Sequence, residues 1–276
     1  MVKLIGNIIN FIGLFSPSSG AKIAIKLFSS PRKGKIRDED LQVLESAFYE
    51  DINHEGQTIG TYRWLGKKET ILLAHGWESN SARWKDLVEL LHAQNYTIVC
   101  LDAPAHGNSS GREFNALFYA EFINIVVSKF KPEIIVGHSV GGMASVFFQH
   151  KYKYEGLQKL VLLGAPAHFK GVFERYNYMM GYSTKINNAM SKQVELKFGH
   201  PPNYFDASSF SKEINSPTLI VHDKQDLIIP YEDALLYEKY LPKNTLITTE
   251  REGHGLKSET VHKSVISFIQ KEIVAA

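Results

Sequence analysis

The stretch Gly137-His138-Ser139-Val140-Gly141-Gly142 separates an apolar run from a helical pattern. The run Ile134-Ile135-Val136 before it predicts a buried strand, and the pattern from Val140 to Tyr152 predicts a helix. A serine in such a strand-to-helix turn is held in a strained backbone conformation with its hydroxyl lifted clear of the sheet. Glycines on both sides are needed, because a Cβ at either position would collide with the neighbouring strand or helix. We therefore interpret Ser139 as a nucleophile rather than as a helix N-cap.

Apolar runs and helical patterns alternate along the chain on both sides of this turn. Short, nearly all-apolar strands separated by helices predict an α/β fold, with a mostly parallel central sheet and helices on both faces. The first two strands are expected to form an antiparallel pair. The expected strands are Leu44–Tyr49, Thr58–Trp64, Ile71–Ala74, Tyr96–Leu101, Glu133–Val136, Leu160–Leu163, Thr218–His222 and Thr245–Thr249, and the expected helices are Trp84–Gln94, Phe114–Lys129, Val140–Tyr152, Glu232–Tyr240 and Glu259–Gln270.

The alternation stops between the sixth and seventh expected strands. This segment is too long for an ordinary strand–helix connection and is rich in Phe, Tyr and Met. We interpret residues 167–211 as an inserted helical cap over the strand ends. The alternative is a plain extra helical pair, whose small core would account for most of these aromatic residues. Residues 41–166 and 212–276 then form the α/β core, and residues 1–40 form an amphipathic, basic N-terminal segment.

The N-terminal segment allows three interpretations. Its apolar residues Ile5, Ile8, Ile9, Ile12 and Phe15 fall on one face at helical spacing, and Ser16–Gly20 is expected to break that helix. The helix could pack on the main domain, lie on an anionic membrane, or belong to a signal peptide cleaved near Gly20. Location follows the same choice: cytoplasmic, with peripheral membrane contact through residues 1–37, or exported.

The composition excludes several classes of protein. With 276 residues, 44% of them hydrophobic, the chain is an ordinary globular protein, and its apolar runs are too short to cross a bilayer. The single cysteine, Cys100, can form neither an intrachain disulfide nor a thiolate zinc site. Residues 1–37 hold seven of the basic side chains and no acidic one, so the rest of the chain is mildly acidic, which argues against a nucleic-acid-binding core.

A serine nucleophile needs a base, and the base needs a carboxylate that orients it. The strand Thr218–His222 is followed by two aspartates, of which Asp226 is our candidate acid and Asp223 the alternative, with a role in turning the chain. The candidate base is His254, which follows the last expected strand and has a glycine on each side.

Donors for a developing oxyanion are expected from two backbone N–H groups, those of Trp77 and Val140. His75, His106 and His138 lie beside these positions in the sequence and are further candidates for substrate contact. The loop Asp102–Gly107 is expected to have a structural role beside the site.

These motifs, in this order, resemble the α/β-hydrolase superfamily in its serine-nucleophile, esterase- and lipase-like branch, over about residues 43–276. The resemblance implies hydrolysis of a carboxylic ester through an acyl-enzyme, as in an esterase or a lysophospholipase- or monoglyceride-lipase-like enzyme, with no metal or cofactor. The aromatic, Met-rich cap favours an apolar acyl group in a small-molecule substrate. Thioesterase, C–C hydrolase and acyltransferase chemistry, or non-catalytic ligand binding, are the alternatives, and the oligomeric state stays open. Two features depart from the family: Glu78 after Trp77, which could disfavour anionic substrates, and the basic N-terminal segment.

Overall fold

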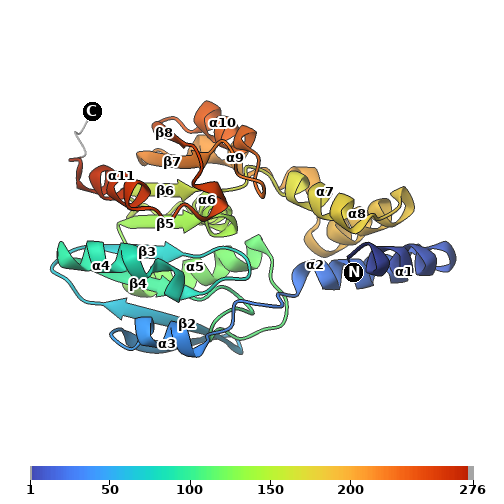
Figure 1. The fold of residues 1–276 in the computed structure, drawn as a ribbon, viewed down its shortest axis with the longest axis horizontal. Helices are drawn as coiled ribbons and strands as arrows, with labels where there is room; N and C mark the ends of the chain where they lie inside the picture. Colours follow the sequence, from blue (N-terminus) through green and yellow to red (C-terminus); the bar gives the residue numbers. More distant parts are fainter. Residues whose placement is uncertain (1, 273–276) are drawn as a thin grey trace. The chain divides into compact units, whose positions relative to one another are not determined.

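The computed structural model describes residues 2–272, and the described chain contains an eight-stranded sheet (Figure 1). The strand order is β1-β2-β4-β3-β5-β6-β7-β8. β2 pairs antiparallel with both β1 and β4, and all the other neighbouring strands are parallel. The α/β fold class expected from the sequence is therefore confirmed.

Most elements lie where the sequence predicts them, with small differences at their ends. The strands are β1 (Phe48–His54), β2 (Gln57–Trp64), β3 (Lys68–Ala74), β4 (Tyr96–Leu101), β5 (Ile134–His138), β6 (Lys159–Leu163), β7 (Thr218–Asp223) and β8 (Asn244–Thr249). The helices of the same compact unit are α3 (Asp38–Leu44), α4 (Lys85–Ala93), α5 (Ala116–Phe130), α6 (Val140–Tyr152), α9 (Ala207–Phe210), α10 (Tyr231–Tyr240) and α11 (Glu259–Gln270), with the single-turn helices η1 (Ser81–Trp84), η3 (Ser211–Glu213) and η4 (Gly253–Gly255).

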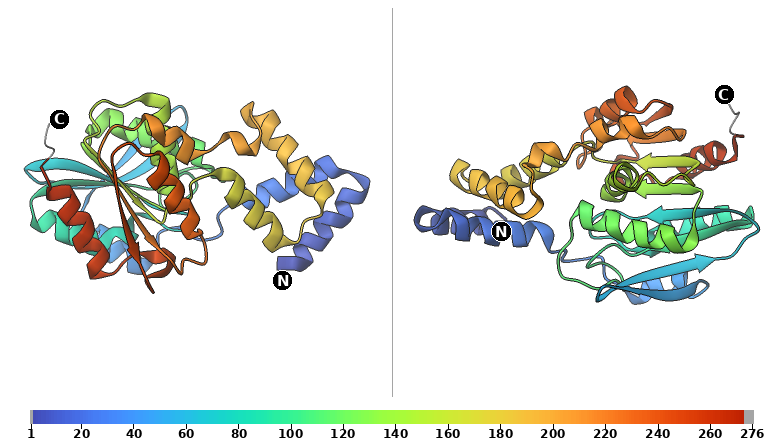
Figure 2. Two further views of the ribbon diagram at one scale, coloured as in Figure 1. Left: turned by 90° about the horizontal axis from the view of Figure 1, so that it is seen from above. Right: turned by 180° about the vertical axis from the view of Figure 1, so that it is seen from behind.

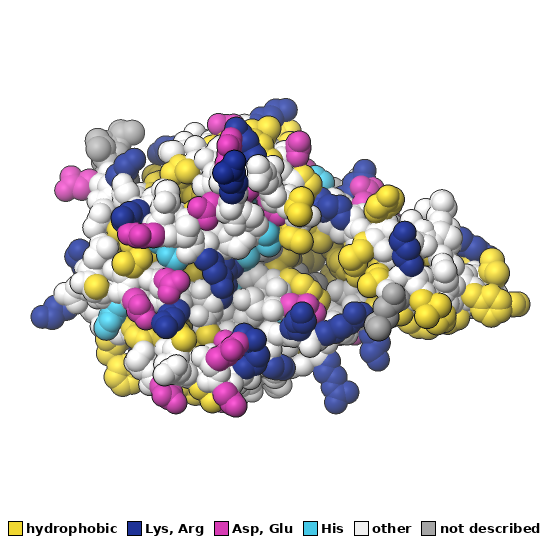
Figure 3. Space-filling model, viewed as in Figure 1, with side chains coloured by type: hydrophobic (Ala, Val, Ile, Leu, Met, Phe, Trp, Pro, Cys, Tyr) yellow, Lys and Arg dark blue, Asp and Glu magenta, His cyan; other side chains and the backbone are white. Residues whose placement is uncertain are grey.

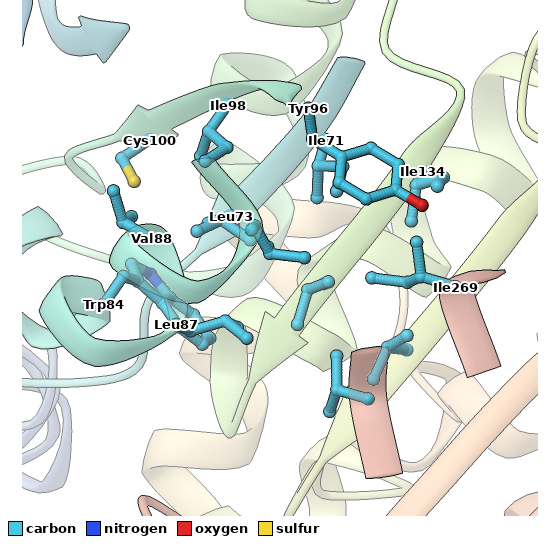
Figure 4. Packing of buried hydrophobic residues seen from close by; sticks show 14 of the residues in the cluster. Ile71, Leu73, Trp84, Leu87, Val88, Tyr96, Ile98, Cys100, Ile134 and Ile269 are labelled. Carbon is cyan, nitrogen blue, oxygen red and sulfur yellow. The ribbon is translucent and has the colours of Figure 1, made fainter. Parts of the chain in front are cut away.

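Helices cover both faces of the sheet. Side chains on one face, among them Ile71 and Leu73 of β3, form one buried cluster with Leu87 of α4 and Ile269 of α11 (Figure 4). The opposite face is covered by α5, α6 and α10, which contact β3, β5 and β7 respectively (Figure 2). Since both faces are covered, the central strands β4, β5 and β6 consist mostly of apolar residues, whereas the edge strand β8 does not.

The first expected strand, Leu44–Tyr49, was wrong in its position. Leu44 ends helix α3, and the strand begins only at Phe48. The helix forms because three acidic residues occupy its first turn, and the carboxylate of Asp40 accepts the backbone N–H of Arg37 at 2.9 Å. The antiparallel pairing of the first two strands is as expected.

A second compact unit consists of residues 2–30 together with His168–Ala207. It contains α1 (Val2–Phe15), α2 (Pro17–Ser29), α7 (Phe169–Met180), α8 (Thr184–Phe198) and the short turn η2 (Pro202–Tyr204). α2 packs along α8, and α1 contacts α2, α7 and α8. The inserted helices thus share a core with the N-terminal helices, a grouping that differs from the separate N-terminal segment of the sequence-based division. The other unit contains Pro31–Ala167 and residues 208–272.

The expected helix break at Ser16–Gly20 is confined to one residue. Ser16 caps α2, because its hydroxyl accepts the backbone N–H of Ser19, and Pro17 occupies the first helical position, which proline favours. The apolar face expected for α1 is divided in the structure: Ile9 is buried, whereas Ile8 and Phe15 are exposed. No helix within residues 2–272 is both long and apolar enough to cross a membrane.

Candidate active site

Ser139 occupies the turn between β5 and α6 in a left-handed backbone conformation, with φ at 53° and ψ at −128°. Its backbone N–H donates to the carbonyl of Leu163 on the neighbouring strand at 2.8 Å, which holds the turn against β6. A Cβ on Gly137 would lie 2.5 Å from the Cα of Gly142, and one on Gly141 would lie 2.3 Å from the carbonyl oxygen of Ala74. Glycine is therefore required on both sides of Ser139, as the sequence predicts.

His254 lies on the single-turn helix η4, after the last strand. Its Nε2 is 2.9 Å from the Ser139 Oγ, and its Nδ1 is 2.7 Å from the Asp226 Oδ2. The structure thus brings together the three side chains expected from the sequence, although they are far apart in the chain. The arrangement has the geometry in which an imidazole accepts a hydroxyl proton while a carboxylate fixes its tautomer.

Asp226 follows β7 in a loop whose backbone donates hydrogen bonds to the carboxylate oxygen that does not contact His254. Its Oδ1 accepts the backbone N–H groups of Ile228 and Ile229 at 2.8 and 3.0 Å. Burial alone would raise the pKa of Asp226, but the hydrogen bonds from His254 and from the two amides outweigh burial and lower the pKa below its ordinary value. Asp226 therefore stays ionised beside His254.

Asp223, the alternative acid, hydrogen-bonds to groups other than the imidazole of His254. Its carboxylate accepts the backbone N–H of Gln225 at 2.8 Å, that of Glu252 at 2.8 Å and the hydroxyl of Thr249 at 2.9 Å. These bonds fix the turn after β7 and join it to the segment that leads into η4. This is the turn-forming role that the sequence suggested for this residue.

The expected oxyanion donors lie on the two segments that meet beside Ser139. Val140 is the first residue of α6, where backbone N–H groups have no acceptor within the helix. Trp77 follows Gly76, whose position is so close to the serine that a Cβ there would lie 2.9 Å from the Ser139 Cβ. Ala74 at the end of β3 also pairs with Gly137 at the end of β5. This placement is compatible with both donors facing one oxygen.

His75 and His106 are buried, and their ring nitrogens are engaged by the backbone. His75 Nδ1 donates to the carbonyl of Gly76 at 2.8 Å, and its Nε2 accepts the N–H of Ala103 at 2.9 Å. His106 Nδ1 donates to the carbonyl of Pro104 at 2.8 Å, and its Nε2 accepts the N–H of Glu78 at 3.0 Å. The two rings therefore connect loops. Neither has a nitrogen left to bind substrate, contrary to the expectation.

Burial also keeps both imidazoles neutral. It lowers the pKa of His75 to about 4 and, together with the neighbouring His75, lowers the pKa of His106 to about 4. A neutral ring with one donating and one accepting nitrogen is the form that both hydrogen-bond patterns require.

His138, the third candidate for substrate contact, also supports the base. Its Nε2 donates to the backbone carbonyl of His254 at 2.8 Å, and the two rings lie 4.9 Å apart. Burial holds the pKa of His138 well below its ordinary value, so the ring is neutral. The contact holds the backbone of His254. In the sequence, the only sign that His138 belongs to the site was its position next to Ser139.

Asp102 organises the loop beside the site, as expected. This buried carboxylate accepts the backbone N–H of Ser81 at 2.9 Å, the Ser81 hydroxyl at 2.7 Å and the N–H of Asn108 at 2.8 Å. Sequence reasoning missed a further support. In residues 31–37, the Nζ of Lys35 donates to the carbonyls of Gly107 and Ser109 at 3.2 and 3.3 Å, which binds this basic loop to the segment after β4.

Glu78 also has a structural contact that the sequence did not reveal. Its carboxylate accepts the backbone N–H of Arg32 at 2.9 Å, and its own backbone adopts a positive φ of 50°. The side chain thus joins the basic loop to the segment that carries Trp77. No group of three or more His, Cys, Asp or Glu side chains within residues 2–272 is arranged to hold a metal ion.

Comparisons with known proteins agree with the fold. Residues 69–200 match a family model described as alpha/beta hydrolase fold, and residues 185–274 match one described as TAP-like protein. The chain is 23% identical to a bifunctional esterase/perhydrolase of Acinetobacter calcoaceticus, over 72% of this chain and 91% of the relative. It is 21% identical to the pimeloyl-[acyl-carrier protein] methyl ester esterase of Wigglesworthia glossinidia brevipalpis, over 73% of this chain and 93% of the relative. Its fold resembles the solved structure of an esterase from Exiguobacterium antarcticum, with a TM-score of 0.63 at 17% identity, covering 82% of this chain and 100% of that one.

Proposed function

Because this chain belongs to the α/β-hydrolase superfamily and is a hydrolase acting on ester bonds, we propose that it cleaves carboxylic esters through an acyl-enzyme formed on Ser139. The observation that carries the proposal is the pair of contacts at His254, 2.9 Å to the Ser139 hydroxyl and 2.7 Å to the Asp226 carboxylate. A ligand-binding protein has no need for a serine that is activated in this way.

In the proposed first half-reaction, the Ser139 Oγ attacks the ester carbonyl carbon. His254 Nε2 takes the hydroxyl proton and then gives it to the oxygen of the departing alcohol. Asp226, ionised and held by two backbone amides, keeps the other ring nitrogen protonated and stabilises the imidazolium. In the second half-reaction, His254 activates a water that attacks the acyl-enzyme, and the proton returns to Ser139.

The negative oxygen of each tetrahedral intermediate would lie against the backbone N–H groups of Trp77 and Val140. Each donor of this kind typically stabilises the transition state by about 3–4 kcal/mol. The support for this assignment is the place of Val140 at the start of α6 and the close approach of Gly76 to the serine.

The substrate we propose has an apolar acyl group. The loop that carries Asp226 presents Leu227 and Ile228 to solvent, with exposed fractions of 95% and 58%. These exposed apolar side chains lie on the loop that carries the proposed acid, and an apolar surface of this kind favours an apolar acyl group.

Hydrolysis of p-nitrophenyl esters from acetate to palmitate tests this proposal. The wild type is compared with Ser139→Ala and with Ser145→Ala, which removes a buried hydroxyl that only bonds the carbonyl of Gly141 in the same helix. We expect activity in the wild type and in Ser145→Ala, a loss of at least about 1,000-fold in Ser139→Ala, and higher kcat/KM for acyl chains longer than acetyl.

Two results would contradict the proposal in different ways. If a fluorophosphonate labels Ser139 but no ester is turned over, the nucleophile stands and the ester assignment fails, in favour of thioesters or C–C bonds. If neither turnover nor labelling occurs, the nucleophile itself is refuted.

A further inference from the structure

Helix α1 packs into its unit through its smallest side chains. A Cβ on Gly6 would lie 1.8 Å from the carbonyl oxygen of Met180, and one on Gly13 would lie 2.5 Å from the Cδ1 of Ile186. Ile9, between these glycines on the same face, is 1% exposed. The inner face of α1 therefore fits α7 and α8 closely: a side chain at position 6 would overlap backbone, and one at position 13 would displace the end of the Ile186 side chain.

Polar contacts fix the rotation of α1 about its own axis. The amide of Asn10 donates from Nδ2 to the carbonyl of Gly181 at 2.8 Å and accepts the backbone N–H of Ser183 at its Oδ1, also at 2.8 Å. The Nζ of Lys185 donates to the carbonyl of Leu14 at 3.1 Å, in the last turn of the helix. α1 is thus an integral part of this unit, and the direction of its outer face is determined.

The outer face carries a continuous apolar row. Leu4, Ile8, Phe11 and Phe15 fall within an arc of about 60° at 100° per residue, opposite Gly6 and Gly13. Their exposed fractions are 63%, 53%, 62% and 79%, and Leu14 beside them is 65% exposed. Figure 3 shows hydrophobic side chains gathered over this unit, with Lys and Arg around them.

An exposed apolar row of this size marks a binding surface. Together the five side chains expose on the order of 600 Å², which is at the upper end of the largest patch of a typical monomer. Isolated exposed apolar residues are ordinary, but here large side chains point outward along a helix that buries glycines. We call this row the α1 outer face (Leu4, Ile8, Phe11, Leu14 and Phe15). We expect it to bind a partner.

The charge of the unit indicates which partner. Residues 2–30 and His168–Ala207 contain eight Lys and Arg against three Asp and Glu, a net charge of +5, while the rest of the chain has a net charge of −3. Lys3 precedes the apolar row on α1, and Lys22 and Lys26 lie exposed on one side of α2. A second copy of this unit would carry the same positive charge and be repelled, whereas an anionic lipid surface would be attracted.

We propose that the α1 outer face docks on membranes that contain anionic lipids, with its apolar side chains at the boundary between headgroups and acyl chains. The lysines of α1 and α2 then lie among the lipid headgroups. The surface belongs to the four-helix unit alone, and the proposal does not depend on ester hydrolysis.

Flotation with vesicles tests this docking surface on the full chain. The protein is mixed with vesicles of phosphatidylcholine alone or with 30% phosphatidylglycerol, and the bound fraction gives a partition coefficient. The variant Phe11→Ser/Phe15→Ser removes two side chains of the α1 outer face. The matched control, Phe48→Ser/Leu65→Ser, removes side chains that are 61% and 54% exposed in the other unit.

We expect the wild type to bind vesicles with phosphatidylglycerol, the α1 variant to partition at least about tenfold more weakly, and the control to bind like the wild type. Hydrolysis of a water-soluble ester should be equal in all three proteins, so a failure of the proposed function would be seen separately. Equal binding of the α1 variant, or no binding of the wild type, would overturn the proposal. Self-association in light scattering that only the α1 variant abolishes would assign the face to a second copy instead and would overturn it too.

Discussion

In both the sheet-containing unit and the four-helix unit, glycines let a helix approach a neighbouring element closely. The side chains found beside these close contacts differ between the two units. In the first, Gly141 lets α6 approach the end of β3 closely at the turn that carries Ser139. In the second, Gly6 and Gly13 let α1 approach α7 and α8, and the large side chains of the helix point outward. Close backbone contact thus accompanies a different feature in each unit: the buried nucleophile Ser139 in the first and an exposed apolar surface in the second.

The largest effect we expect is a loss of activity from a substitution in the sheet-containing unit. Asp226→Asn keeps the shape of the side chain but removes the charge that holds His254, so we expect kcat/KM for p-nitrophenyl butyrate to fall about 1,000- to 10,000-fold. Asp223→Asn should reduce activity far less, because its carboxylate contacts only backbone amides and Thr249. Steady-state kinetics of both variants checks this, and a larger loss in Asp223→Asn would refute the assignment.

Acid should weaken the sheet-containing unit first. His75 and His106 have pKa values of about 4 when folded, because burial disfavours the charged ring, against about 6.5 when unfolded. The unfolded chain therefore binds more protons between these values, and the stability from the neutral rings is complete above pH 6.5 and lost as the pH falls toward 4. Each ring contributes up to roughly 3 kcal/mol to that loss. Hydrogen exchange of β3 and β4 amides at pH 7 and pH 4.5, corrected for the intrinsic rates, measures it, and equal protection at both would contradict the account.

How far the sequence predicts the structure differs between the units. In the sheet-containing unit, Ser139, Asp226 and His254 could be placed because each lies next to a short apolar strand, and parallel strands bring their carboxyl ends to one edge. The sequence could not show that both nitrogens of His75 and His106 bind backbone groups, because each Nε2 accepts an N–H from a loop 28 residues away in the chain.

In the four-helix unit, hydrophobic periodicity predicted a helix in α1 but not its rotation. Ile8 and Ile9 belong to the same apolar arc, yet one is exposed and the other buried. The inner face is set by Gly6 and Gly13, whose fit against Met180 and Ile186 is a property of partners about 170 residues away. A periodic pattern records hydrophobicity, and glycine contributes almost nothing to it.

Filling the close contact of α1 should loosen the four-helix unit and leave the catalytic site intact. In Gly6→Ala the new methyl group would overlap the carbonyl of Met180, so α1 must shift, which costs about 1–3 kcal/mol. We expect exchange of α7 and α8 amides to become roughly 5- to 100-fold faster, with hydrolysis of p-nitrophenyl acetate unchanged. Asn7→Ala, on the exposed side of the same helix, is the control. Unchanged exchange in Gly6→Ala would show that α1 does not pack as described.

A smaller effect is expected for Asn10→Ala. This change removes both hydrogen bonds to the α7–α8 connection, each worth about 0.5–1.5 kcal/mol, and the higher helix propensity of alanine offsets part of the loss. The net destabilisation of the unit should be about 1 kcal/mol relative to Asn7→Ala, measured by the same exchange experiment. Equal behaviour of the two alanine variants would mean that Asn10 does not fix α1.

The measurement that tests the central claim most directly is mass spectrometry of the protein after reaction with a fluorophosphonate. The account predicts one adduct on the peptide that carries Ser139, its loss in Ser139→Ala, its retention in Ser145→Ala and much slower formation in His254→Ala. An adduct on another residue, or labelling of Ser139 at the same rate without His254, would contradict the account.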